Sequence, residues 1–176
     1  MTREEFLLSL LRCRGMGEAA NRAQVEFFRR HGLSESVLRH IAEREANFAV
    51  GVSFLSAETR ILRGGDGIRL AGRDWQVLIG EGHSPAQLLL YAPYDRLFLG
   101  ADQVLGTITP NIPVTFTEPD GDPLSEFLAS LRSLKPAVAP DSLVLPGHKL
   151  PFFGLHERID ALIAHHEDSL ERIVGL

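Results

Sequence analysis

The sequence predicts an α/β protein in which a helical segment precedes a small sheet and its covering helices. Three observations predict this class. The first fifty residues repeat apolar side chains at helical spacing, the next fifty place short apolar runs between glycine-rich turns, and the remainder alternates helical and strand patterns. We expect one domain over 1–176, with a helical segment over 1–50 and the sheet with further helices over 51–176.

The N-terminal segment is predicted to form three helices. Apolar residues at helical spacing begin shortly after Glu4, and a second helix runs from Glu18 to Arg30, where Gly32 ends it. Ser34 then caps a third helix that continues to about Asn47. The first third of the chain is therefore expected to be helical.

The middle of the chain is predicted to form a small sheet. Turn clusters rich in glycine and aspartate separate its apolar runs, and a Pro-Tyr-Asp turn joins the last two runs as a hairpin. The expected strands cover Ile68–Leu70, Trp75–Ile79, Leu88–Tyr91 and Leu97–Leu99.

The C-terminal part is predicted to alternate helix and strand. Asp122 caps a helix that has Pro123 in its first turn, and Ser142–Leu145 reads as a short buried strand. A final helix over Leu155–Val174 carries one apolar stripe, and we expect His156 to cap its start.

Composition excludes several classes of function. An apolar fraction of 44% with 23% charged residues is ordinary for a globular protein. The net charge of −5 and the lack of a long basic block argue against nucleic acid and against an anionic membrane surface as partners. We therefore expect the partner to be a small-molecule substrate or another protein.

The cellular location is expected to be cytoplasmic. Cys13 is the single cysteine, so no disulfide can form within the chain, and the N-terminus lacks the pattern of a secretion signal. No apolar run approaches the roughly 20 residues that a membrane-spanning helix needs.

Three short motifs carry residues that can bind a metal. They are Gly82-His83-Ser84-Pro85, Gly100-Ala101-Asp102-Gln103 and Pro146-Gly147-His148-Lys149. Each follows an apolar run that reads as a buried strand, so His83, Asp102 and His148 are expected at strand ends on one edge of the sheet. Imidazole nitrogen and carboxylate oxygen are ligands of catalytic zinc.

In this order the three motifs resemble the second half of a metallo-β-lactamase-fold, glyoxalase II-like metal-dependent hydrolase. The resemblance implies a partial αββα sandwich with N-terminal helices, one mixed sheet and covering helices. It implies that His83 completes one metal site, Asp102 bridges two, and His148 completes the second. Zinc is the expected metal, although iron or manganese suit the same ligands and the site of this chain could stay empty.

The resemblance also implies ester or thioester hydrolysis by metal-activated water. Family members carry an early His-x-His-x-Asp-His cluster, which this sequence lacks, so no catalytic residue is assigned beyond the metal ligands. Ala101 stands where the family has glycine. Asn111 follows the Asp102 motif and either lines the substrate opening or forms a turn.

Two readings of the missing cluster remain open. In the favoured one the chain is the C-terminal portion of a truncated hydrolase; in the other it is a non-catalytic binding module that kept the second half of the fold. A three-residue site for a single metal is a weaker third possibility. Since half a sandwich exposes an apolar sheet face, we expect a homodimer.

Overall fold

The computed structural model describes residues 1–14, 17–44, 56 and 58–175, which divide into two compact units. The first unit consists of Met1, Arg3–Ile61 and Val114–Gly121, and the second of Thr2, Leu62–Pro113 and Asp122–Leu176. The expectation of a single domain stays a prediction, and its internal boundary at residue 50 lies outside the described residues.

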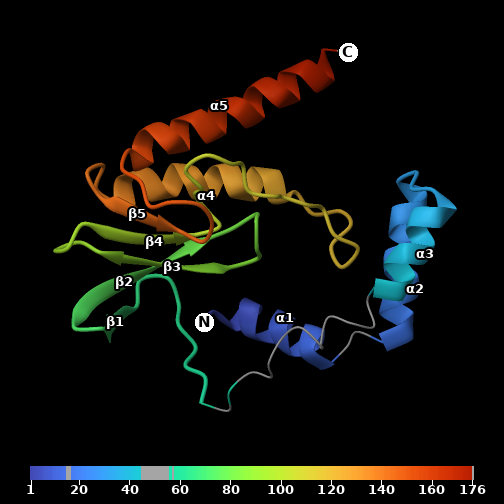
Figure 1. The fold of residues 1–176 in the computed structure, drawn as a ribbon, viewed down its shortest axis with the longest axis horizontal. Coiled ribbons are helices and arrows are strands. Elements are labelled where there is room, and N and C mark those ends of the chain that lie inside the picture. The colour runs from blue at the N-terminus through green and yellow to red at the C-terminus, as the bar shows by residue number, and fades with distance from the viewer. Residues whose placement is uncertain (15–16, 45–55, 57, 176) are drawn as a thin grey trace. The chain divides into compact units, whose positions relative to one another are not determined.

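The first unit contains the three predicted helices, drawn in blue in Figure 1. They are α1 (Arg3–Arg14), α2 (Gly17–Arg30) and α3 (Glu35–Arg44). Gly32 has φ 83°, a conformation that glycine adopts without steric cost, and it lets the chain turn between α2 and α3. The expected continuation of α3 to Asn47 lies outside the described residues.

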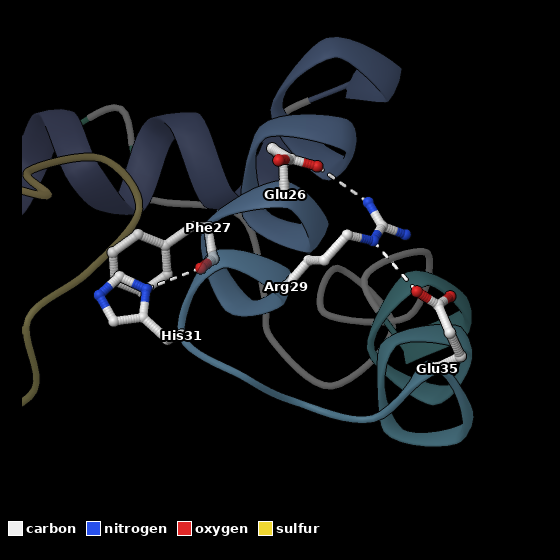
Figure 2. A network of polar contacts seen from close by, with 5 residues as sticks. All are labelled: Glu26, Phe27, Arg29, His31 and Glu35. Carbon is white, nitrogen blue, oxygen red and sulfur yellow. Dashed lines mark hydrogen bonds and ion pairs between the residues drawn. The ribbon is translucent and has the colours of Figure 1, made fainter.

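Arg29 links α2 to α3 (Figure 2). Its guanidinium donates to Glu26 at 2.9 Å and to Glu35 at 3.1 Å. The hydrogen bond from Arg29 lowers the pKa of Glu35. His31 lies nearby, with Nδ1 2.7 Å from the carbonyl of Phe27, so this imidazole is occupied by its own helix end.

The second unit is built on one mixed sheet in the strand order β1-β2-β3-β4-β5. Its strands are β1 (Gly67–Leu70), β2 (Arg73–Gly80), β3 (Gln87–Ala92), β4 (Leu97–Ala101) and β5 (Leu143–Pro146). The first three pairings are antiparallel, and β5 is parallel to β4. Every predicted strand is present, and the predicted α/β class with one mixed sheet is confirmed.

Two helices cover one face of this sheet, as Figure 1 shows in orange and red: α4 (Pro123–Ala137) and α5 (Leu155–Val174). Alternate strand residues face them and form the main core, which includes Leu89, Phe98 and Val144. The intervening residues, such as Trp75, Val77 and Leu90, form a second cluster on the opposite face. Among the described residues of this unit, no helix covers that second face.

The final helix has the predicted bounds, but its start differs from expectation. Gly154 is the N-cap, with φ 89° and no side-chain cap. His156 lies inside the helix, and its Nε2 is 2.9 Å from the carbonyl of Val138 at the end of α4. The prediction that His156 caps the helix is therefore wrong, because its imidazole is hydrogen-bonded to the C-terminal end of the neighbouring helix instead.

None of the helices in the described part of the chain is both long and apolar enough to span a bilayer.

Candidate metal centre

The strand directions bring the three motifs to one edge of the sheet. Because β3 is antiparallel to both β2 and β4, β2 runs parallel to β4, and β5 is parallel to β4 as well. The carboxyl ends of these three strands therefore meet at one edge. His83, Asp102 and His148 each follow one of those ends.

Gly82 shapes the loop that carries His83. It is buried and has φ 89°, and a Cβ there would collide with the carbonyl of Pro123 and with Phe127, both on α4. Only glycine combines that backbone angle with so close an approach. The loop thus lies directly against α4, and this contact fixes the position of the backbone just before His83.

The other two loops meet at Asp102. Ala101 has φ 42°, which turns the chain sharply at the end of β4, and its carbonyl accepts a 2.7 Å hydrogen bond from the backbone of Gly147. A Cβ on Gly147 would collide with Oδ1 of Asp102. The glycine before His148 therefore leaves room for the carboxylate.

The two imidazoles flank the Asp102 carboxylate. Nε2 of His83 lies 3.6 Å from Oδ2, and Nε2 of His148 lies 3.6 Å from Oδ1. Side-chain exposure is 25% for His83, 28% for Asp102 and 64% for His148. Buried Oδ1 has no hydrogen-bond partner among the described residues. Such an orphaned buried oxygen is rare in proteins.

These separations suit shared coordination better than direct hydrogen bonding. A charge-assisted N–H···O bond is about 2.7–2.9 Å long. Two ligands at tetrahedral angles on one zinc ion lie about 3.4 Å apart, given bonds of about 2.0–2.2 Å. The observed 3.6 Å is close to the second value.

The tautomer of His83 supports the same conclusion. Its Nδ1 lies 2.7 Å from the carbonyl of Asn111, which can only accept, so the proton belongs on Nδ1. In the tautomer with its single ring proton on Nδ1, Nε2 presents a lone pair to a carboxylate oxygen. Two facing acceptors repel each other unless a cation lies between them, and metal-bound histidines commonly donate their other ring N–H to a carbonyl in this way.

The geometry is that of two pairs rather than one three-ligand cluster. Each imidazole faces a different oxygen of Asp102. Accordingly, the part of the chain that the structure describes contains no group of three or more His, Cys, Asp or Glu side chains able to hold a metal ion together. The donor chemistry fits zinc, with Asp102 between two positions that each need further ligands.

Asn111 contributes to this site through its backbone. Asn111 is exposed, and its backbone carbonyl oxygen makes the contact with His83. A substrate role for its side chain stays a prediction.

The sequence pattern does not predict the roles of three supporting residues. Buried Gln103 and Ser130 are hydrogen-bonded to each other, and Arg158 on α5 donates to the carbonyls of Leu105 and Ile108. Burial lowers the pKa of Arg158. A polar residue directly after Asp102 was the one signal available, and it does not distinguish a buried amide from an exposed one.

Comparison with known proteins points to one group of folds. No protein-family model matches the sequence, and neither does any curated protein. Among solved structures, a β-lactamase domain protein from Burkholderia ambifaria is 34% identical, with a TM-score of 0.83 over 98% of this chain. A metallo-β-lactamase family protein from Thermus thermophilus is 26% identical, with a TM-score of 0.79 over 99% of this chain.

The match covers only part of these two proteins. This chain spans 47% of the Burkholderia protein and 54% of the Thermus protein. Nearly all of its own residues align, so the two proteins share its fold and contain about as much chain again.

Proposed function

We propose that this chain, which shares the metallo-β-lactamase fold with about half of each of these two proteins, supplies the second half of a metal-dependent hydrolase site. The observation that carries the proposal is the placement of His83 and His148, each 3.6 Å from a different oxygen of Asp102. Zinc suits these donors best, and iron or manganese are the alternatives.

The chain's own residues have distinct tasks in this proposal. His83 is oriented by the Asn111 carbonyl so that Nε2 points at Asp102. Asp102 would offer Oδ2 beside His83 and Oδ1 beside His148, whose side chain is the most exposed of the three. Bound zinc would supply Lewis acidity and activate water for attack on an ester or thioester carbonyl.

The substrate class rests on the resemblance alone. Ester or thioester hydrolysis of a small molecule is our proposal, together with a cytoplasmic location. The sequence lacks the His-x-His-x-Asp-His cluster, so we expect little or no turnover from these 176 residues by themselves. The competing proposal is a non-catalytic binding module, which the same absence favours.

Metal content tests the proposal directly. We would purify the chain without chelator and determine metal by elemental analysis in the wild type, in His148→Ala and in His40→Ala. His40 is an exposed histidine on α3 and serves as the matched control. We expect about one or more zinc equivalents in the wild type and in H40A, and a clear loss in H148A, because one of the two donor pairs is broken.

Equal metal content in H148A and H40A would contradict the metal site. Retained metal together with no hydrolysis of thioester or ester probes would favour the binding module instead.

A further inference from the structure

Gln103 is a polar side chain with no exposed surface, directly after Asp102. Its Nε2 donates to the carbonyl of Glu81 at 3.1 Å and to the hydroxyl of Ser130 at 3.2 Å. A buried amide is unfavourable unless it is hydrogen-bonded, and an apolar residue would avoid that requirement. Its presence in the core therefore calls for a reason other than packing.

Ser130 closes a small network around this amide. It lies on α4 with 5% of its surface exposed, and its Oγ accepts the backbone N–H of Glu81 at 3.2 Å. The end of β2 is also shaped for Gln103, since a Cβ on Gly80 would lie 2.6 Å from Oε1 of the amide. Gln103, Ser130 and the backbone of Glu81 thus form one hydrogen-bonded triangle.

This triangle connects the two loops that carry His83 and Asp102. Glu81 lies two residues before His83, and Gln103 is the next residue after Asp102. Ser130 anchors both to α4, the helix on which Gly82 already rests. The positions of the two loops relative to each other are consequently set by one buried and two partly buried hydrogen bonds.

The network is not optimised for stability. Oε1 of Gln103 is buried without a hydrogen-bond partner among the described residues. A half-satisfied buried polar group destabilises a core, and such groups in native proteins call for an explanation. Holding two ligand loops in place is a benefit that offsets this cost.

We propose that Gln103 and Ser130 are positioning residues that hold the His83 and Asp102 loops at the separation a metal ion requires. This inference rests on the proposed function. Neither residue touches the metal position. Each acts by preorganising the donor atoms, which otherwise have to be ordered when the metal binds.

Zinc affinity of the full chain tests the inference. It would be measured by competition with a chromophoric chelator in the wild type, Gln103→Met, Ser130→Ala and Ile159→Val. Methionine matches glutamine in length without its hydrogen bonds, and S130A keeps Gln103 while removing the anchor. Ile159 is fully buried on α5 in the main core, so I159V is a destabilising control outside the network.

We expect zinc binding to weaken by about tenfold or more in Q103M and S130A, as for other groups that orient metal ligands. I159V is expected to lower the thermal midpoint and to leave zinc affinity unchanged. Wild-type affinity in folded Q103M and S130A would overturn the inference. A loss of equal size in all three variants would also overturn it, because the effect would then be general destabilisation.

A wild-type chain that binds no zinc would refute the metal proposal rather than this one. The inference would then be decided by the imidazole nitrogen shifts of His83 in the metal-free chain. A change in Q103M and S130A but not in I159V supports positioning, and unchanged shifts in all variants overturn it.

Discussion

At the scale of single residues, Ala101 stores strain beside the site. Its φ of 42° is in the left-handed region, which costs a residue with a Cβ roughly 1–2 kcal/mol. The backbone turn at this position lets the Ala101 carbonyl accept from Gly147 and directs Asp102 toward the imidazoles. Alanine at this position is therefore a tolerated departure from glycine, and it comes at the expense of stability.

Ala101→Gly should stabilise the chain. It removes a backbone strain of roughly 1–2 kcal/mol, while the greater freedom of glycine in the unfolded chain costs about 0.4–1 kcal/mol, so the net gain is at most about 1.6 kcal/mol. Urea denaturation would measure it. Ala164→Gly, on the exposed face of α5, is the control and should cost about 1 kcal/mol. A loss of stability in A101G would show that the turn is not strained.

The residues of the site differed in how well the sequence predicted them. The sequence predicted that His83, Asp102 and His148 lie at one edge of the sheet, because each follows an apolar run and the strand directions then bring them together. That they bind a metal stays a prediction. Gln103 and Ser130 were missed, because their pairing depends on how α4 packs against the sheet and no local pattern encodes that contact.

At the scale of elements, α4 is the support on which the site is built. Gly82 lies against its first turns and Ser130 reaches the ligand loops from its middle. Its start is set by Asp122, whose carboxylate accepts from the backbone N–H of Ser125 at 3.0 Å and from its hydroxyl at 2.6 Å. These hydrogen bonds, the one from the hydroxyl first, lower the pKa of Asp122.

The cap should make stability depend on pH. Because the folded state has the lower pKa, the cap stabilises above the unfolded-state pKa of aspartate, and this contribution is lost as pH falls through the folded value. Asp122→Ala should therefore lower the urea midpoint at pH 7, and the difference from wild type should shrink in acid. Asp122→Asn keeps an acceptor without the carboxylate's titration, so its effect should vary less with pH. A difference between D122A and wild type that is the same at both pH values would contradict this role.

Elements with strong local signals were predicted well and their ends less so. Pro123 after Asp122, and the glycine turns around the strands, mark boundaries that the structure has within one or two residues. The apolar stripe of α5 predicts burial along the whole helix, but at its C-terminal end Leu170 and Ile173 are 42% and 69% exposed. Periodicity identifies an apolar face but does not reveal where the partner surface stops.

At the scale of the molecule, the second face of the sheet bears on association. Apolar side chains on this face pack around Trp75 and Val77 and remain partly exposed; they include Ile68, Ile79, Leu88, Leu97 and Leu99. In the sheet, β1 pairs only with β2, which leaves one open edge, whereas Phe152 bridges to Val144 beside β5. Exposed faces and edges of this kind favour association.

We therefore propose a homodimer in which a second copy covers this face. Light scattering should give twice the 19.4 kDa chain mass for the wild type, and Leu88→Glu should reduce it to one chain mass with unchanged circular dichroism. Leu150→Glu is the control, because Leu150 is 80% exposed on the loop after His148 and belongs to neither cluster. A monomeric wild type would refute the dimer, and loss of mass in L150E as well would place the contact elsewhere.

The parallel pairing of β4 with β5 affects the order in which the three donor residues come together during folding. Short connections join β2, β3 and β4 into successive hairpins, which form locally in about 1–10 µs. The His83 loop is the connection between β2 and β3, and Asp102 directly follows β4. Leu97 pairs with Leu143 only after the long crossover through α4 closes, and closing so long a loop is entropically slow. Of the three donor residues, we therefore expect His148 to be the last to reach its place during folding.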